Sequence, residues 1–396
     1  MASPAGIKFQ PSKRTRAGPR AGGVLGYLRG VTFCLLWYFS ILAGFYLLYC
    51  PLLPLLVLSP RHYRAFTEII FGAWETYPTA LMEIMMGTKI VVVGDKVDPE
   101  DRALIVMNHR TRLDWNYLWA AMFHGCHPPS HRLKFVLKSA VRHFPGPGWV
   151  MQMTCFLYIH RSWEMDQKLM NKVLDYFKDI GHTCQLLIFP EGTDLTKQSK
   201  ASSDRYAAKH NLPEYERVLH PKTTGFAFLS QRLRGDGQLD AVYDLTIAYP
   251  KSVPQTEKDM LKGMFPEEVH FKIKRHAIES LPLDEVGYRQ WLCQQWKDKE
   301  ESLQEFYKTQ SFPQDCPRIH DRPVGAKTVN ALHLSFVAWT ALTLFSIYAL
   351  FSFWWFQMWV LATTSLFVML SFVGDGFQHL EIALHYARKH HEKKCN

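Results

Sequence analysis

The sequence lacks the features of a secreted or serine-nucleophile protein. Its eight cysteines show no CxxC pair and no framework spacing, and no Asn lies in an N-x-Ser/Thr pattern. Such cysteines are typical of reduced thiols facing a cytosol-like compartment. No small-residue cleavage site follows the first apolar run, which argues against a removed secretory signal. The G-x-S-x-G pattern is also absent, so nothing indicates a serine nucleophile.

Acidic residues are missing from the first 67 positions, which carry eight Lys/Arg. Residues 381–396 hold four basic residues against two acidic ones, and the part between these ends carries 34 of each sign. The net charge of +10 therefore belongs to the two ends. This distribution does not indicate nucleic acid as a partner. It follows the positive-inside rule for the cytoplasmic tails of a membrane protein.

Charged side chains are absent from two long stretches. Residues 30–60 contain none, and residues 331–373 contain none over 43 positions. A bilayer core needs about 20 apolar residues per helix. The second stretch predicts two transmembrane helices joined by a turn around 351–357. The first predicts one span over 31–49, with a break at the two prolines that follow, and together they indicate an integral membrane protein.

The stretch 66–86 could return the chain to the side from which it entered. Glu68, Glu75, Glu83 and Pro78 make it a poor span, so we expect a half-embedded amphipathic segment. Both termini and the segment between the membrane regions would then face the cytoplasm. The final Lys-Lys-Cys-Asn resembles a dilysine signal for retrieval to the endoplasmic reticulum, with a snorkelling basic tail as the alternative.

Between about residues 88 and 325, short β-branched runs alternate with helical patterns. This alternation predicts an α/β fold with a mixed, mostly parallel sheet flanked by helices. The expected strands are 90–93, 103–107, 134–137, 156–159, 185–189, 241–248 and 269–274. The expected helices are 113–123, 139–143, 164–180, 225–234 and 284–307.

These patterns divide the chain into five parts. In order they are a basic cytoplasmic tail (1–29), N-terminal membrane-embedded helices (30–87), the α/β domain (88–325), two transmembrane helices (326–375) and a second basic cytoplasmic tail (376–396). In parallel sheets, ligand-binding groups gather beyond the carboxyl ends of the strands. The unusual polar clusters of this sequence follow expected strands in the same way.

The first cluster directly follows the strand 103–107 and reads Asn108-His109-Arg110-Thr111-Arg112-Leu113-Asp114-Trp115. A turn between His109 and Asp114 can bring an imidazole within hydrogen-bond reach of a carboxylate. The carboxylate would fix the tautomer and leave the other ring nitrogen free to accept a proton. Thr111-x-x-Asp114 is also the pattern of a helix capping box, so the spacing alone leaves both interpretations open.

Three smaller clusters lie at other element ends. Glu191 and Gly192 follow the strand 185–189 in Phe-Pro-Glu-Gly-Thr-Asp, where glycine permits close approach of a ligand. Arg161 ends another strand with a guanidinium suited to phosphate. Lys222 precedes a helix start that could hold an anion through backbone N–H groups.

Potential metal ligands gather at His124, Cys126, His127 and His131. Their spacing is irregular, and the Pro-Pro loop between them is typical of a solvated connection. We therefore expect no metal site.

Together the motifs resemble the glycerolipid acyltransferase family, of the bacterial lysophosphatidic-acid acyltransferase type, over about residues 85–255. The runs N-H-R-T-R-L-D-W, L-L-I-F-P-E-G-T-D-L-T, H-P-K-T-T-G-F and A-Y-P look closest to its lysocardiolipin acyltransferase branch. That branch is also similar in its C-terminal membrane segments and its lysine-rich tail. The resemblance covers most of the chain.

The resemblance implies an enzyme that moves a fatty acyl group from acyl-coenzyme A to the free hydroxyl of a lysophospholipid, with no further cofactor. His109 would be the general base and Asp114 its partner. Substrate contacts are implied for Asn108, Lys138, Arg161, Glu191, Gly192, Thr193 and Lys222.

One residue departs from the pattern of many lysophosphatidate enzymes, which carry Arg after Glu-Gly-Thr. This chain has Asp194, a carboxylate that cannot pair with an acceptor phosphate. The expected acceptors are therefore lysocardiolipin, lysophosphatidylinositol or lysophosphatidylglycerol, with lysophosphatidate as the alternative. A non-catalytic lipid-binding scaffold is the rival outside enzymes, although a scaffold would not need both His109 and Asp114.

Overall fold

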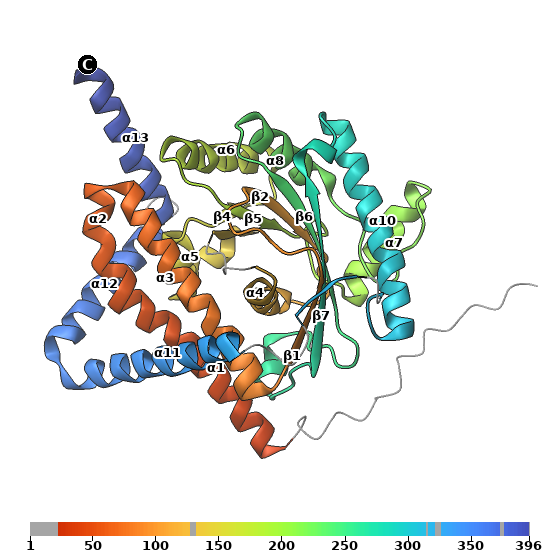
Figure 1. The fold of residues 1–396 in the computed structure, drawn as a ribbon. Helices are drawn as coiled ribbons and strands as arrows, with labels where there is room; N and C mark the ends of the chain where they lie inside the picture. Colours follow the sequence, from red (N-terminus) through yellow and green to blue (C-terminus); the bar gives the residue numbers. More distant parts are fainter. Residues whose placement is uncertain (1–22, 127–131, 314–315, 321–325, 373–375, 396) are drawn as a thin grey trace, which may run out of the picture.

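The computed structural model describes residues 23–126, 132–313, 316–320, 326–372 and 376–395 (Figure 1). In this part of the chain an eight-stranded sheet has the order β4-β3-β5-β2-β6-β7-β1-β8. The strands are β1 (Lys89–Gly94), β2 (Ala103–Met107), β3 (Leu133–Lys138), β4 (Leu157–Ile159), β5 (Gln185–Ile188), β6 (Ala241–Ala248), β7 (Glu268–Ala277) and β8 (Arg318–His320). Only β6 with β7 and β1 with β8 pair antiparallel among these strands. The expected mixed, mostly parallel sheet is thus confirmed, and β8 is an additional short edge strand.

The helices surround this sheet and extend from it at both ends of the chain. The longer ones are α1 (Val24–Gly44), α3 (Pro60–Ala80), α4 (Asp114–Gly125), α6 (Trp163–Asp179), α7 (Lys197–Lys209), α8 (Thr223–Gly235), α10 (Glu285–Thr309), α11 (Ala326–Ser352), α12 (Trp354–Phe372) and α13 (Phe377–Cys395). The shorter ones are α2 (Leu53–Leu58), α5 (Pro147–Met153) and α9 (Glu257–Leu261). Single π or 3-10 turns occupy Phe45–Tyr49, Cys50–Leu52, Leu81–Met86, Ser139–His143 and Ile278–Ser280.

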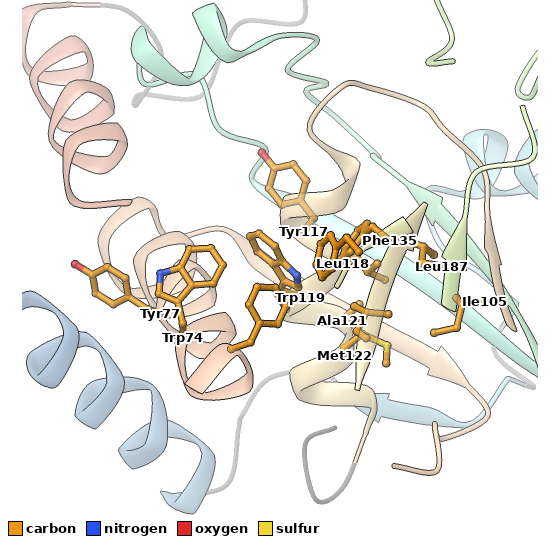
Figure 2. Close-up of a cluster of buried hydrophobic side chains, with 14 of the residues drawn as sticks. Trp74, Tyr77, Ile105, Tyr117, Leu118, Trp119, Ala121, Met122, Phe135 and Leu187 are labelled. Carbon is orange, nitrogen blue, oxygen red and sulfur yellow. The ribbon is translucent and has the colours of Figure 1, made fainter. Parts of the chain in front are cut away.

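The sheet is buried on both faces, which explains why β2 is an unbroken apolar run. Alternate residues point to opposite faces, so Ile105 joins one core and Leu104 the other. The first core lies under α4 and the N-terminal helices, and the second lies under α6, α8 and α10. Figure 2 shows the first core as a continuous row of rings and aliphatic side chains from α3 through Trp119 of α4 to the sheet.

Three helical stretches of the described residues are long and apolar enough to cross a membrane: Val24–Leu58, Lys327–Ser352 and Trp354–Phe372. The C-terminal pair agrees with the expected hairpin and turns at Phe353. The N-terminal stretch differs from the expectation, because a 3-10 turn carries the helix past its first proline and the chain reverses only at the extended Ser59. A proline in the first turn of a helix loses no hydrogen bond, which explains the continuity.

The membrane helices are joined to one another and to α3 by polar side chains. Tyr77 of α3 lies 3.0 Å from the hydroxyl of Thr340 in α11, and Thr76 lies 2.6 Å from Ser335. The indole of Trp359 in α12 donates to the backbone carbonyl of Tyr46 at 2.9 Å. Such interhelical hydrogen bonds hold helices together where apolar surroundings provide no driving force of their own.

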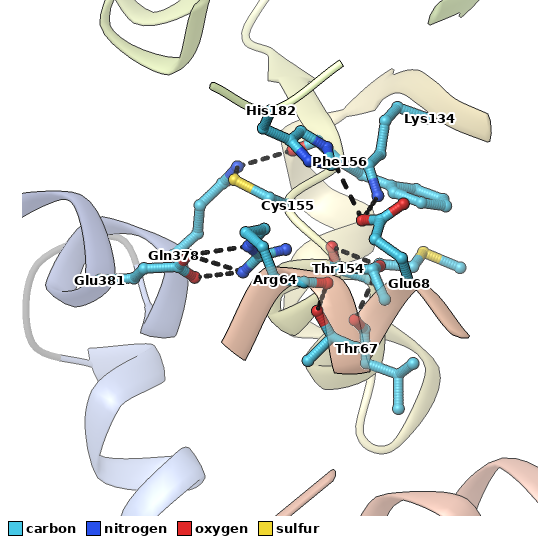
Figure 3. Close-up of polar contacts among 12 residues, drawn as sticks. Arg64, Thr67, Glu68, Lys134, Thr154, Cys155, Phe156, His182, Gln378 and Glu381 are labelled. Atoms are coloured by element: carbon cyan, nitrogen blue, oxygen red, sulfur yellow. Dashed lines mark hydrogen bonds and ion pairs between the residues drawn. The ribbon is translucent and has the colours of Figure 1, made fainter. Parts of the chain in front are cut away.

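Helix α3 carries its charges inward. Phe66 and Ile69 are about half exposed on its outer face, whereas Glu68 is paired with the fully buried Lys134 of β3 (Figure 3). Arg64 is buried as well and binds a carboxylate far along the chain. The acids that make this stretch a poor span in isolation are therefore turned toward the rest of the protein, while Phe66 and Ile69 face outward. Aromatic side chains of the same helix pack in the first core: Phe71, Trp74 and Tyr77.

The segment 376–396, expected as a basic tail, contains helix α13, which packs against the domain. Its Glu381 accepts from the Arg64 guanidinium at 2.6 Å on both carboxylate oxygens (Figure 3). It also accepts from the Tyr176 hydroxyl of α6 at 2.6 Å. Lys389 pairs with Asp179 at the end of α6 at 2.7 Å. These contacts connect α13 both to the N-terminal helices and to the sheet domain.

Helix α1 is joined to the domain through glycines. A Cβ atom at Gly30 would overlap the backbone of Met260 and Gly263, which lie in and after α9. Gly263 has a left-handed backbone with φ of 71°, and a Cβ there would overlap the backbone of Gly26. Only glycine permits this backbone-to-backbone contact.

Candidate active site

The carboxyl ends of β2, β5 and β4 bring the sequence-predicted polar clusters to one edge of the sheet. Strand β2 pairs in parallel with β5, and β3 joins β5 to β4 in the same direction. The loops that follow these strands therefore leave the sheet on the same side. His109 follows β2, Glu191 follows β5 and Arg161 follows β4.

His109 and Asp114 form a hydrogen-bonded pair. Nδ1 of His109 lies 3.0 Å from Oδ2 of Asp114, and the two side chains are 18% and 0% exposed. The carboxylate favours the tautomer that carries the proton on Nδ1. Nε2 makes no hydrogen bond to the described residues and is left as a proton acceptor.

Asp114 pairs with His109 without forming the capping box. Helix α4 begins at Asp114 itself, after Leu113, with no side-chain cap bond. Oδ2 of Asp114 accepts from the backbone N–H of Thr111 at 2.9 Å while the same carboxylate binds His109, and Oδ1 accepts from the Tyr249 hydroxyl at 2.6 Å. These donors hold the carboxylate beside the imidazole.

The surroundings of His109 favour its protonated form on balance. Burial opposes the charge, but the hydrogen bond that His109 donates to Asp114 and the negative charges of Asp114, Glu191 and Asp194 outweigh it, so the pKa of His109 is raised from 6.5. The ring also stacks on Phe189 at 4.3 Å between centroids. The stack limits rotation of the imidazole.

Glu191 lies beneath the site and faces backbone rather than solvent. It is 3% exposed, and its two oxygens accept from the backbone N–H groups of His109 at 3.1 Å and Leu219 at 3.0 Å. Burial raises the pKa of the Glu191 carboxyl to about 8, against the lowering effect of those two donors. In this geometry the carboxyl holds the loop of His109, and its contact with an acceptor stays a prediction.

Arg161, Gly192 and Lys222 meet above Glu191. The Arg161 guanidinium donates to the Gly192 carbonyl at 3.1 Å, and Arg161 itself has φ of 66°, a conformation that costs an ordinary side chain about 1 kcal/mol. Gly192 is also left-handed, and a Cβ there would come within 3.2 Å of Nζ of Lys222. The glycine thus leaves room for an exposed lysine and an exposed arginine at the rim.

The remaining predicted residues take different places. Asn108 is buried and bridges β2 to β6, accepting from the Ile247 N–H at 2.9 Å and donating to its carbonyl at 3.1 Å. Thr193 is exposed and its hydroxyl donates to Asp194 at 3.3 Å. Lys138 is the exposed last residue of β3 at the same edge.

The metal alternative is only partly within the described residues, because His127 and His131 lie outside them. His124 lies 2.5 Å from Oε1 of Glu83 and stacks on His320. No group of three or more His, Cys, Asp or Glu side chains that could hold a metal occurs among the residues described.

Two residues of the site carried no signal of their role in the sequence. Tyr249 stood within the quoted Ala-Tyr-Pro run without an assigned partner, and Leu219 contributes only a backbone N–H, which any residue type could supply. The structure shows that both hold carboxylates next to His109.

Comparisons with known proteins identify the same region. Residues 89–250 match the Acyltransferase family model, and residues 259–337 match the Acyltransferase C-terminus model. Lysocardiolipin acyltransferase 1 of Danio rerio is 45% identical over 291 residues, which cover 74% of each chain. The protein of that name from Gallus gallus is 38% identical over 92% of this chain and 97% of its own.

Two further proteins are also similar. Lysophosphatidylinositol acyltransferase 10 of Caenorhabditis elegans is 38% identical over 72% of each chain. The crystal structure of PlsC, a 1-acyl-sn-glycerophosphate acyltransferase from Thermotoga maritima, covers 70% of this chain and 98% of its own, with a TM-score of 0.45 and 15% identity. On the extent and identity of the curated matches, the chain belongs to the glycerolipid acyltransferase family, as an acyltransferase with membrane helices at both ends.

Proposed function

We propose that the chain transfers a fatty acyl group from acyl-coenzyme A to the free hydroxyl of a lysophospholipid, with His109 as the general base. The observation that carries this proposal is the pair of His109 with the buried Asp114 at 3.0 Å, which leaves Nε2 of a partly exposed ring without a partner among the described residues. A scaffold that only bound lipid would gain nothing from such an oriented imidazole.

In the proposed reaction, Nε2 of His109 takes the proton of the acceptor hydroxyl as its oxygen attacks the thioester carbonyl. The tetrahedral intermediate then expels the coenzyme A sulfur, and the imidazolium returns the proton to that sulfur. Asp114 stabilises the imidazolium between these steps. A general base of this kind contributes about 10²- to 10⁴-fold to the rate.

The cationic rim supports a phosphate-bearing substrate. Arg161 and Lys222 are both exposed beside Gly192, and either could meet a phosphate of the acceptor or of coenzyme A. Arg161 is also a candidate donor to the oxyanion. Lys138, Gly192 and Thr193 are proposed as further contacts at the same edge.

The proposed acceptors are lysocardiolipin, lysophosphatidylinositol or lysophosphatidylglycerol. Relatives named lysocardiolipin acyltransferase and lysophosphatidylinositol acyltransferase support the first two choices. Asp194 supports it as well, because a carboxylate follows Glu-Gly-Thr where a cation would suit lysophosphatidate. Phospholipid remodelling is the corresponding proposed role.

We also propose that both ends of the chain and the α/β domain face the cytoplasm at the endoplasmic reticulum membrane. The start of α1 meets α9 and helix α13 meets α6, so both of these helices lie against the domain. The basic ends favour the cytoplasmic side, and the Lys-Lys-Cys-Asn sequence favours the endoplasmic reticulum. Protease protection of both ends in sealed microsomes would contradict the orientation.

The experiment that tests the function uses membranes containing the full chain, an acyl-coenzyme A and a lysophospholipid, with release of the coenzyme A thiol as the readout. We expect His109→Ala to fall to background, whereas His210→Ala, a variant of an exposed histidine at the end of α7, keeps its rate. More than about a tenth of wild-type activity in His109→Ala would sink the assignment, given the size of a general-base contribution.

A panel of acceptors with one donor then settles the head group. The panel contains lysocardiolipin, lysophosphatidylinositol, lysophosphatidylglycerol and lysophosphatidate. We expect the rate with lysophosphatidate to be the lowest of the four, and the opposite order would favour the alternative acceptor.

A further inference from the structure

Glu300 of α10 is a buried carboxylate outside the site described above. It is 3% exposed, and it accepts from three successive backbone N–H groups, those of Glu216, Arg217 and Val218, at 2.8, 2.8 and 3.1 Å. Gln304, one turn further along α10, donates to the same carboxylate at 2.9 Å. A carboxylate is the only common side chain that can accept so many donors at once.

The next N–H group in the same run binds the carboxylate beneath the site. Leu219 N–H donates to Oε2 of Glu191, and Oε1 of Glu191 accepts from the backbone N–H of His109. Four consecutive N–H groups, at residues 216–219, are therefore divided between Glu300 and Glu191. The position of Leu219 depends on the three residues before it, which Glu300 holds.

The support for this run comes from α10 itself. Lys299, the neighbour of Glu300, is 2% exposed and binds Asp244 and the Leu245 carbonyl of β6, which fixes α10 to the sheet. The Arg217 guanidinium lies 4.5 Å from the ring centroid of Tyr307 on the same helix. Residues 216–219 form no helix or strand, so these contacts determine their path.

A second connection joins the run to the cationic rim. Three residues after Leu219, the backbone N–H of Lys222 donates to the Pro190 carbonyl at 2.8 Å. The Lys222 side chain lies over Gly192. A shift of residues 216–219 would therefore move Lys222 as well as Glu191.

We infer that Glu300 is a positioning residue of the acyl transfer, which holds residues 216–219 so that Leu219 fixes Glu191 and Glu191 fixes the backbone of His109. The inference rests on the proposed function, since it assigns Glu300 an effect on a reaction in which His109 is the base. Glu300 touches no reacting atom and acts through backbone donors. Through Glu300, helix α10 in the C-terminal half of the domain would help to position the loop that carries His109.

The test compares Glu300→Gln with Glu301→Gln in membranes containing the full chain. Glutamine keeps the size of Glu300, but its amide N–H groups face backbone donors, so part of the run is released. Glu301 is exposed on the same helix and serves as the matched control. We expect kcat/KM for acyl transfer to fall about tenfold in Glu300→Gln, a loss of the size that hydrogen bonds to charged groups provide, and to stay unchanged in Glu301→Gln.

The pH profile separates positioning from loss of folded enzyme. Without the Leu219 donor the pKa of Glu191 rises further above its value of about 8, so less of its negative charge remains beside His109 as the pH approaches 8, and the pKa of His109 falls. Since the base must be neutral, the acid limb of kcat/KM should move to lower pH in Glu300→Gln. A purely structural role would lower the amount of active enzyme and leave the limb where it is.

The possible outcomes decide between the two proposals. If wild type and His109→Ala are equally inactive, the proposed function fails. The positioning role is overturned if wild type is active, His109→Ala is inactive, and Glu300→Gln matches wild type in both rate and pH profile. Should Glu300→Gln not accumulate, Glu300→Asp supplies the same test, because the shorter carboxylate keeps its charge but reaches fewer donors, and an unchanged rate and pH profile there overturns the role too.

Discussion

At the rim of the sheet, the Asp114 carboxylate orients an imidazole that is 18% exposed and keeps Nε2 without a partner among the described residues. Beneath α3, the Glu381 carboxylate binds Arg64 on both oxygens and Tyr176 as well, with the two charged side chains 2% and 0% exposed. Both pairs join segments through a buried carboxylate. They differ in exposure, since Nε2 of His109 belongs to a partly exposed ring at the rim, whereas Nη1 of Arg64, which has no partner in the described part of the chain, is buried.

The difference teaches how to separate chemistry from stability in a protein that buries many charges. Buried pairs such as Lys134 with Glu68 hold helices in place and offer no group to a substrate. Leaving one nitrogen of an oriented imidazole unpaired adds nothing to stability, but proton transfer requires such a nitrogen. Variants of the two pairs should therefore separate rate from stability.

The largest expected effect is on the rate at the rim. Asp114→Asn keeps the shape of the side chain but removes the charge that stabilises the imidazolium and favours the wrong tautomer. We expect kcat to fall about 10²- to 10⁴-fold, measured by thiol release in membranes. The unfolding midpoint in detergent should also fall, by less than the rate implies, because the new amide group faces one of the donors that bind Asp114. A rate within threefold of wild type would remove the basis for the pair's role.

The second expected effect, at the ion pair beneath α3, is on stability rather than on rate. Arg64→Met leaves Glu381 buried without its cation, and we expect a loss of about 3–5 kcal/mol in the free energy of unfolding. Thermal or denaturant unfolding of the detergent-solubilised chain measures it. The rate per folded molecule should stay within about twofold of wild type.

A double variant checks that the unpaired charge is the cause. Arg64→Met with Glu381→Met removes both charges and should recover most of the lost stability, because two apolar side chains replace a buried ion pair at small net cost. If the double variant is as unstable as Arg64→Met alone, shape rather than charge holds α13 in place.

The smallest expected effect is that of a variant that changes both the rate and the stability. Tyr249→Phe removes one hydrogen bond to Asp114 at an otherwise unchanged ring. We expect about 1–2 kcal/mol less stability and a rate reduced about three- to tenfold, because the carboxylate is held less firmly. A matched variant is Tyr243→Phe, whose hydroxyl binds Asp101 at the opposite end of β6 and should affect stability alone.

Much of the fold was accessible from the sequence because its signals are local. The strand 103–107 has the predicted bounds, since an apolar run between polar residues suffices to define it. The pairing of His109 with Asp114 could be predicted from the sequence because only a short turn separates the two residues. Sequence neighbours of strand ends share an edge of the sheet, which explains why Arg161 and Gly192 come together, whereas Lys222 reaches them from the start of α8.

The rest depended on partners that no local pattern shows. Arg64 and Glu381 are 317 residues apart, and only the folded chain brings them together. The hydropathy of residues 66–86 predicts a poor membrane span because it treats every acid as lipid-facing. In the structure, Glu68 instead faces Lys134 of β3. Leu219 acts through its backbone N–H, so its side chain carries no signature of its position.

The glycine contact between α1 and the domain has a mechanical consequence. Because the backbone around Gly30 and Gly263 touches without side chains between, α1 cannot slide or rotate without moving the sheet domain. A change in bilayer thickness that tilts α1 would thus tilt the whole catalytic edge. The position of His109 relative to α1 is accordingly set by the folded chain, so that the two move together.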